Sequence, residues 1–250
     1  ADELNLGLES VVFLDDSPFE RTRVREMLPE VLVPELPKNP EDYNAFLSKL
    51  RCFDKTYITD EDKIRGDLYK SESKRTKLKQ QLKSLSDWIK TLDLTITIEN
   101  IKNENTPRAV QLLNKTNQMN LSTRRLNERE FNKWVQEDKN NLWTIRAADK
   151  FGDYGIIGIF SISIKDNVAT LVDFILSCRV VGRYIEETMI EFLKEFCYEN
   201  NVNKIKGKYK KTEKNSLCYY FFNKLKLINS NQHSFEFSSN QKKSNLLNIK

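Results

Sequence analysis

The second half of the chain alternates between two patterns of apolar residues. Alternating or short continuous apolar runs predict strands over residues 95–99, 142–147, 154–164, 168–178, 204–209 and 233–237. Apolar residues at helical spacing predict helices over residues 108–117, 127–138, 185–199 and 213–223. The predicted order, β-α-α-β-β-β-α-β-α-β, indicates an α/β domain whose mixed sheet is flanked by helices.

The first 92 residues carry shorter and weaker patterns. They predict strands at residues 10–14 and 31–33 and helices over residues 19–28, 42–53 and 63–92. Apolar positions in the last of these helices become dense only toward its end, so we expect a connector whose final turns pack on a domain. The expected parts of the chain are a first unit of residues 1–45, a helical connector of 46–92, the α/β domain of 93–238 and a flexible tail of 239–250.

Composition is typical of a soluble, helix-rich globular protein, with 39% hydrophobic and 31% charged residues. No apolar run is long enough to span a membrane. The four cysteines are scattered and His233 is the single histidine, which argues against a Cys/His zinc site. We therefore expect a cytoplasmic protein with reduced thiols and no membrane association.

Charge is distributed unevenly along the chain. Residues 1–45 hold eleven acidic and four basic side chains, whereas residues 204–226 hold eight lysines and the single acid Glu213. A basic face attracts a polyanion, either nucleic acid or an acidic carrier protein with a phosphopantetheine arm. An ordinary solvated lysine face explains the same pattern equally well.

The most informative stretch is residues 172–189, where an apolar strand leads through a turn into a helix. The first turn of a helix leaves backbone N–H groups unpaired at its positive end, which favours an anion. Arg179 and Arg183 add positive charge beside it. Cys178 at the strand end could become an acyl acceptor, since both features favour its thiolate, or it could be a buried strand residue.

Two adjacent acids, Asp15 and Asp16, follow the first predicted strand. Neighbouring carboxylates repel one another unless a hard cation such as Mg²⁺ lies between them, so the pair is a candidate metal site. A helix cap combined with a turn acid would place the same residues there.

The order of elements in the second half is that of the GNAT acetyltransferase fold. GNAT proteins carry a [QR]xxGx[GA] signature where the fourth strand meets its helix, and residues 179–184, RVVGRY, resemble it except at Tyr184. The resemblance implies that Arg179, Gly182 and Arg183 bind coenzyme A or a carrier-bound phosphopantetheine. Because small residues let the backbone approach a pyrophosphate, Tyr184 favours the carrier-bound arm with its single phosphate.

The same resemblance suggests roles for further residues. Asn215 matches the asparagine that contacts the pantetheine arm, and Tyr219 or Tyr220 matches the tyrosine that protonates a leaving thiolate. Four residues of the loop after the first helix, which borders the acceptor pocket in GNAT folds, are candidates for substrate binding: Asn117, Gln118, Asn120 and Arg124. Helix capping, turns and core packing are the competing explanations for these residues.

A more specific resemblance extends over most of residues 1–225. The segments FLDDSPFER, LPEVLVPELP, TNQMNLSTRR, KFGDYGIIGIF, FILSCRVVGR and IKGKYKKTEKNSLCYYFF are similar to successive blocks of the FkbH-like family. That family joins a haloacid-dehalogenase (HAD) phosphatase domain to a GNAT-like domain. It transfers a glyceryl unit from 1,3-bisphosphoglycerate to an acyl carrier protein, on the way to methoxymalonyl-type extender units or tetronates.

The resemblance places Asp15 and Asp16 among the Mg²⁺ ligands of a HAD domain. The HAD nucleophile belongs to a DxDx[TV] motif far upstream of such acids, and the sequence contains no such motif. We therefore expect a C-terminal fragment of an FkbH-like protein, preceded here by a HAD-like Rossmannoid remnant, and we expect no phosphatase activity from it. Mg²⁺ would belong to the complete HAD domain.

The expected function is acyl or glyceryl transfer to an acyl carrier protein, without nucleic acid as a partner. One alternative is a non-catalytic module that docks the carrier protein. Another is an N-acetyltransferase that uses acetyl-CoA, against which Tyr184 argues. The oligomeric state stays open.

Overall fold

The computed structural model describes residues 7–54, 65–82, 84–225, 228–229, 234–239 and 248–249. The chain forms two compact units, Ala1–Ile58 and Thr59–Lys250. The helices in its described part are α1 (Pro18–Met27), α2 (Tyr43–Leu47), α4 (Arg65–Gln81), α5 (Leu85–Leu92), α6 (Thr106–Lys115), α7 (Glu128–Val135), α8 (Ile185–Glu199) and α9 (Ser216–Lys224). The expected division at residues 45, 92 and 238 stays a prediction, and α4 and α5 belong to the larger unit.

The first unit contains the predicted helix α1 and little regular strand. Ser17 caps α1 by accepting a hydrogen bond from the Glu20 backbone N–H at 3.4 Å. The two expected strands meet only at an isolated parallel bridge between Val12 and Leu32. The helix predicted over residues 42–53 is limited to the short α2. The half-buried side chains of α2 supply little packing to extend it.

The single connector helix predicted over residues 63–92 is wrong. The structure has two helices, because the Ser84 side chain accepts from the Asp87 backbone N–H at 3.1 Å and begins α5 as a new helix. Trp88, Ile89 and Leu92 of α5 are buried, as expected for the final turns of this segment. The predicted beginning of this helix, residues 63–64, lies outside the described residues.

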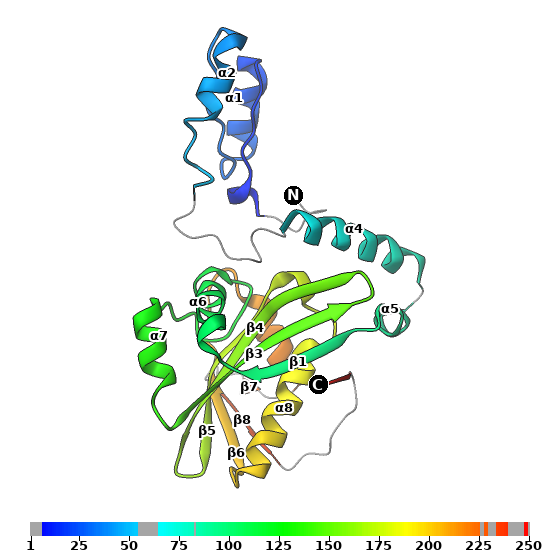
Figure 1. Ribbon diagram of the computed structural model, residues 1–250, viewed down its shortest axis with the longest axis vertical. Helices are drawn as coiled ribbons and strands as arrows, with labels where there is room; N and C mark the ends of the chain where they lie inside the picture. Colours follow the sequence, from blue (N-terminus) through cyan, green and yellow to red (C-terminus); the bar gives the residue numbers. More distant parts are fainter. Residues whose placement is uncertain are drawn as a thin grey trace. The chain divides into compact units, whose positions relative to one another are not determined.

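The larger unit is built on one mixed sheet (Figure 1). Its strands are β1 (Thr95–Asn100), β2 (Met119–Asn120), β3 (Asn140–Asp149), β4 (Gly152–Lys165), β5 (Val168–Leu176), β6 (Lys204–Lys208), β7 (Ile228–Asn229), β8 (Ser234–Ser238) and β9 (Asn248–Ile249). The order across the sheet is β7-β8-β6-β5-β4-β3-β1-β9, with β2 pairing to β5. β5 and β6 are parallel, whereas β1, β3, β4 and β5 form antiparallel neighbours.

This strand order is the one that the GNAT fold requires, so the fold predicted from the element order is confirmed. Three short strands were not predicted: β2 inside the loop expected to be polar, β7, and β9 inside the expected tail. Each has two residues, too few to produce an apolar alternation. The predicted start of β8 at His233 lies outside the described residues.

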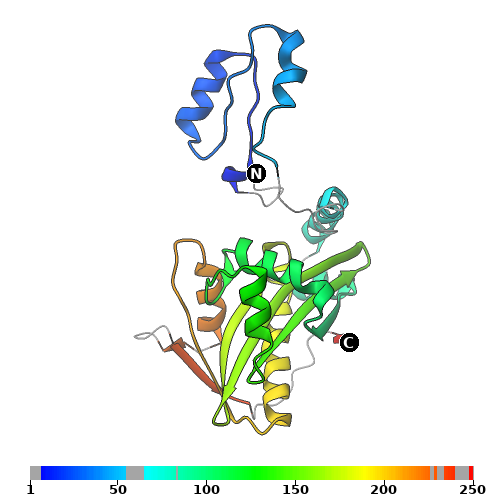
Figure 2. The ribbon, with the colours of Figure 1, turned by 60° about the vertical axis from the view of Figure 1, so that its left-hand side comes forward.

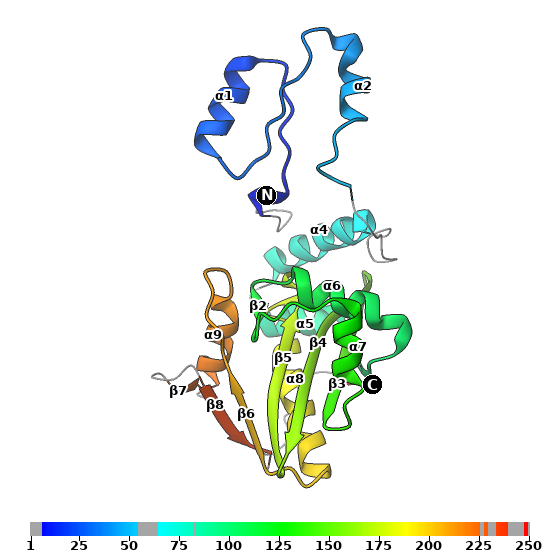
Figure 3. The same ribbon diagram turned by 90° about the vertical axis from the view of Figure 1, so that its left-hand side faces the viewer.

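The alternation of side chains along the central strands separates two cores. Phe174 and Leu176 of β5 face α8 and α9, while Ile175 faces the opposite core with Leu113 of α6 and Phe131 of α7. Figure 3 shows α7 and α8 on opposite sides of the sheet. Toward one edge, β6 and β8 run side by side beyond the helices α6 and α7 (Figures 2 and 3).

A buried ionic network attaches α4 to the sheet. Arg75 of α4 donates two hydrogen bonds to Asp149 of β3, at 2.7 and 2.8 Å, and its guanidinium lies 4.0 Å from the ring centroid of Tyr154. Tyr154 donates to the same carboxylate at 2.6 Å. Burial opposes ionisation of Asp149, but the hydrogen bonds from Arg75 and Tyr154 hold the pKa of Asp149 below its usual value.

We expect Arg75→Ala to lower the free energy of unfolding by roughly 3–5 kcal/mol, because a buried carboxylate would lose its charged partner. Arg146→Ala is the matched control, since the Arg146–Asp153 pair is exposed and should contribute less than about 1 kcal/mol. All three tryptophans lie in the larger unit, so urea unfolding followed by tryptophan fluorescence reports on it. Equal losses in the two variants would contradict the assigned role.

Candidate functional site

The candidate site lies where the parallel strands β5 and β6 separate. β6 pairs with residues 168–171 of β5, and beyond that point β5 pairs with β2 instead. Leu121, directly after β2, donates its backbone N–H to the Phe174 carbonyl at 3.2 Å. Its own carbonyl accepts from the Lys210 N–H at 3.0 Å. The segment that contains β2 therefore bridges the opening between β5 and the end of β6.

Asn215 is the hydrogen-bonding centre of this bridge. It is fully buried, and its amide oxygen accepts from the Tyr209 hydroxyl at 2.7 Å and the Thr212 N–H at 2.8 Å. Its amide nitrogen donates to the carbonyls of Asn120 at 3.0 Å and Lys210 at 2.8 Å. Asn215, expected to contact a pantetheine arm, thus stabilises the walls of the opening in this structure.

The turn after β5 carries the predicted cofactor residues. Cys178 is exposed just beyond the strand, so its interpretation as a buried strand residue is wrong, whereas Cys197 and Cys218 are buried. The Arg179 Nε donates to the Ser177 hydroxyl at 3.3 Å. Gly182 has φ +78°, a left-handed conformation that glycine adopts without strain.

A carboxyl group from the first turn of α8 reaches back to the turn that precedes the helix. The Gly182 backbone N–H donates to Oε1 of Glu186 at 2.8 Å. The Glu186 side chain is buried, and its Oε2 has no hydrogen-bond partner. The pKa of Glu186 is raised to about 7, chiefly by burial and to a smaller extent by the neighbouring Glu187, against the opposing effects of the Gly182 N–H and Lys224. The N–H expected to face a phosphate is therefore already used.

Arg183 and Tyr184 point away from this turn. The buried Arg183 guanidinium donates to Glu72 of α4 at 2.6 Å and to the Tyr154 hydroxyl, and it lies 5.2 Å from the Trp88 ring centroid. The Arg183 charge, predicted to bind the cofactor, is neutralised inside the domain. Tyr184 adopts φ +62°, and its side chain packs against the α5 cluster around Trp88.

The loop predicted to bind substrate has two exposed and two engaged residues. Asn117 and Gln118 are exposed, and the Asn117 side chain accepts from Arg125 at 2.7 Å. Asn120 is buried and bonds within its own loop, to Thr116 O at 2.9 Å and from Thr123 N at 2.9 Å.

Arg124, the fourth residue predicted to bind substrate, is held by an internal acid. It forms a two-point ion pair with the fully buried Asp173 of β5, which also accepts from Ser161 at 2.6 Å. The Arg124 guanidinium lies over the Trp134 ring, 4.3 Å from its centroid. Arg124 thus holds its own loop against β5 and α7 in this structure.

The aromatic and basic residues on and near α9 differ in how far they are exposed to solvent. Tyr219 is half-buried with its ring 5.5 Å from that of Tyr209, whereas Tyr220 is 64% exposed. Only an exposed hydroxyl can meet a ligand outside the core, so the geometry favours Tyr220 over Tyr219 for contact with one. Along β6, Lys204, Lys206 and Lys208 are exposed and alternate with buried residues.

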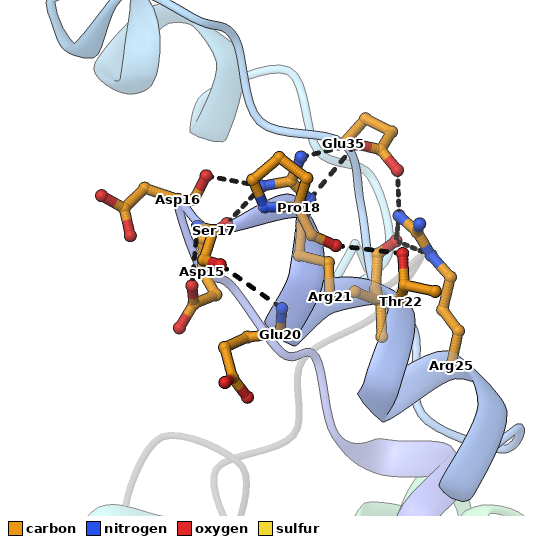
Figure 4. A network of polar contacts seen from close by, with 10 residues as sticks. Asp15, Asp16, Ser17, Pro18, Glu20, Arg21, Thr22, Arg25 and Glu35 are labelled. Carbon is orange, nitrogen blue, oxygen red and sulfur yellow. Dashed lines mark hydrogen bonds and ion pairs between the residues drawn. The ribbon is translucent and has the colours of Figure 1, made fainter.

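The acid pair of the first unit serves its own turn (Figure 4). Asp15 Oδ1 accepts from the Ser17 N–H at 2.8 Å, while the Asp16 carboxylate points away from the network. Buried Arg21 donates to the backbone carbonyls of both acids and to Glu35. No group of three acid, cysteine or histidine side chains in the described residues is placed to hold a metal ion. The Mg²⁺ assignment stays a prediction for a complete HAD domain.

Sequence reasoning missed the two buried acids that shape the site, Glu186 and Asp173. Each had a signal: Asp173 interrupts an apolar strand, and Glu186 follows Gly182 by four residues at the start of a helix. A buried acid requires partners, so both positions predicted a local donor.

No family model matches the sequence, and no curated protein matches it. Solved structures of similar fold include a GNAT-family acetyltransferase from Staphylococcus aureus Mu50, with 11% identity, a TM-score of 0.43, and coverage of 58% of this chain and 99% of that chain. The ribosomal-protein-S18-alanine N-acetyltransferase from Escherichia coli has 9% identity and a TM-score of 0.43, covering 60% and 97%. Spermidine N-acetyltransferase from Vibrio cholerae, in complex with CoA and spermine, has 12% identity and a TM-score of 0.44. The match covers 58% of this chain and 95% of that chain.

At these identities the likeness concerns the fold alone, and the strand order described above carries the assignment of a GNAT-like domain. In the part of the chain that the structure describes, no helix is both long and apolar enough to cross a membrane.

We expect Asn215→Asp to lower the free energy of unfolding by roughly 2–5 kcal/mol, because two buried carbonyls lose their donor and face a carboxylate. Asn117→Asp makes the same change at an exposed position and should shift stability by less than about 0.5 kcal/mol. Chemical denaturation of both variants measures the difference. A tolerated Asn215→Asp substitution would rule out the structural role.

We expect Glu186→Gln to remove a pH dependence of stability. Since the folded-state pKa of about 7 lies above the unfolded value of 4.5, this group's contribution is retained below the unfolded pKa and lost as the pH rises through about 7. The variant should exceed the wild type by roughly 3 kcal/mol above that range and match it near pH 4.5. Urea unfolding across this range, with Glu187→Gln as control, measures the effect. A difference that does not change with pH would contradict it.

Proposed function

We propose that this chain takes part in acyl transfer and that Cys178 accepts an acyl group from an acyl carrier protein. The exposed position of the Cys178 thiol at the carboxyl end of β5 carries the proposal. In open sheets with parallel strands, ligands bind outside the carboxyl ends of the strands. The other two cysteines of the larger unit are buried and cannot meet a carrier-bound thioester.

The chemistry needs no bound cofactor. The Cys178 thiolate attacks the thioester carbonyl of the acyl group on the carrier's arm, and a new carbon–sulfur bond forms as the old one breaks. The pantetheine sulfur leaves as a thiolate and takes up a proton. The exposed hydroxyl of Tyr220 is the candidate donor of that proton, as expected from the sequence.

Lysines near the same edge supply the attraction for an acidic carrier. Because β5 and β6 are parallel, their carboxyl ends lie at one edge, and the exposed lysines 206, 208, 210, 211 and 214 belong to β6 or follow it. Lys204, at the other end of β6, is paired with Glu236 at 2.9 Å. Such a surface mainly accelerates encounter with an acidic partner.

The finer proposal is that the acyl group is a glyceryl unit that originates from 1,3-bisphosphoglycerate, as in FkbH-like proteins. The sequence segments that resemble that family support it. Mg²⁺-dependent steps would then belong to a complete HAD domain that contains Asp15 and Asp16.

A second candidate is a docking module without chemistry of its own. The internal engagement of Arg183, Arg124 and Asn215 favours it, because three side chains expected to contact ligand hold the domain together instead. A third candidate function is that of an N-acetyltransferase that uses acetyl-CoA.

Intact-mass measurement with an acetyl- or glyceryl-loaded acyl carrier protein tests the proposal. We expect an adduct of the acyl mass that neutral hydroxylamine removes, that is lost in Cys178→Ala, and that persists in Cys52→Ala, the matched control at the other exposed cysteine. Raising the salt concentration should slow its formation. Carrier binding without an adduct would favour the docking module, and neither binding nor an adduct would exclude both.

A further inference from the structure

We infer that the chain itself fills the two places where a GNAT-like domain would hold coenzyme A: the opening between β5 and the end of β6, and the turn of residues 179–184. Free coenzyme A therefore does not bind there. The inference concerns the interior of the domain and goes beyond the proposed acyl transfer at the exposed Cys178. Two separate groups of contacts carry it.

The first group closes the strand edge. Where parallel strands separate, each exposes a row of unpaired N–H and C=O groups that an extended ligand can pair with, as an added strand would. In this structure Met119 pairs with Leu176 and Asn120 with Ile175 along that edge of β5. The Leu121 N–H extends the pairing to the Phe174 carbonyl. The edge of β5 that faces the opening is therefore already paired.

The second side of the opening is closed by the same segment. The Leu121 carbonyl accepts from the Lys210 N–H and the Asn120 carbonyl from the Asn215 amide, each at 3.0 Å. Met119, Asn120 and Leu121 are at most 1% exposed. A ligand arm could enter only by moving buried apolar side chains into water and breaking hydrogen bonds on both sides.

The turn of residues 179–184 is closed by a side chain of the chain itself. The Gly182 N–H points at Glu186 Oε1 at 2.8 Å, and the other oxygen, Oε2, is buried without a partner. A side chain of the chain itself thus occupies the N–H just before α8 that an anion would otherwise bind. An incoming pyrophosphate would have to displace the Glu186 side chain from the Gly182 N–H, while the nearby Arg183 is already paired with Glu72.

The orphaned Oε2 of Glu186 distinguishes this turn from one built to receive phosphate. A phosphate site offers unsatisfied donors, whereas in this turn the Gly182 N–H is already used and a buried carboxyl oxygen stands beside it without a partner. The residues present therefore do not fit coenzyme A, and an acyl group that reaches Cys178 must arrive on a carrier that remains at the surface.

Calorimetric titration of the full chain with coenzyme A and with inorganic pyrophosphate tests the inference. We expect no saturable binding of either probe to the wild type at millimolar concentration. Glu186→Ala should bind pyrophosphate saturably, with a dissociation constant at least about tenfold below the millimolar limit set by the wild type, because the Gly182 N–H becomes free. Glu187→Ala removes the same charge from the same helix turn without freeing that N–H, and should behave as the wild type.

Hydrogen exchange of the Leu121 and Lys210 amides reports separately on the closed strand edge. Exchange should be slow in the wild type and unchanged by coenzyme A. Saturable binding of coenzyme A to the wild type, with faster exchange of these amides, would overturn the inference. So would equal gains in pyrophosphate affinity in Glu186→Ala and Glu187→Ala, since these would show a general effect of charge. The adduct at Cys178 is measured in a separate experiment. Failure of the proposed acyl transfer can therefore be told apart from failure of this inference.

Discussion

The shape of the larger unit at the separation of β5 and β6 depends on one buried amide. An asparagine side chain offers two donors and an acceptor in one plane, so Asn215 can satisfy four groups that would otherwise be buried without partners. Those groups belong to β2, to the segment after β6, and to the approach to α9. The positions of all three segments therefore depend on this residue, and the opening between the strands is closed because of it.

Three arginines of the same unit are directed inward. Arg75, Arg124 and Arg183 each bind an acid of another element, which fixes α4 and the loop after β2 to the sheet and the start of α8 to α4. A buried guanidinium that lacks its partner is strongly destabilising, so these residues are poorly suited to exchange an internal acid for a ligand. What remains accessible at this edge is the exposed thiol and the lysine-rich surface, which is why the proposed chemistry lies at the surface.

Much of the fold could be predicted because central strands and amphipathic helices leave a periodic signal. The helix α8 was predicted with its observed bounds, and β3 to β6 were each found within a few residues. The candidate site was predicted less well. Cys178 was found because a strand end is visible in sequence, but the roles of Arg183 and Asn215 were not. Their partners, Glu72 and Asn120, lie 111 and 95 residues away along the chain.

The sequence by itself determined which elements form and in what order, because hydrophobic periodicity and capping residues act over a few neighbouring positions. It also placed a glycine turn at the start of a helix, with a cysteine and two arginines beside it. Only the tertiary structure decided what that turn binds. A helix start attracts any anion, and whether the anion is a ligand or a side chain such as Glu186 depends on which groups the fold brings within hydrogen-bonding distance.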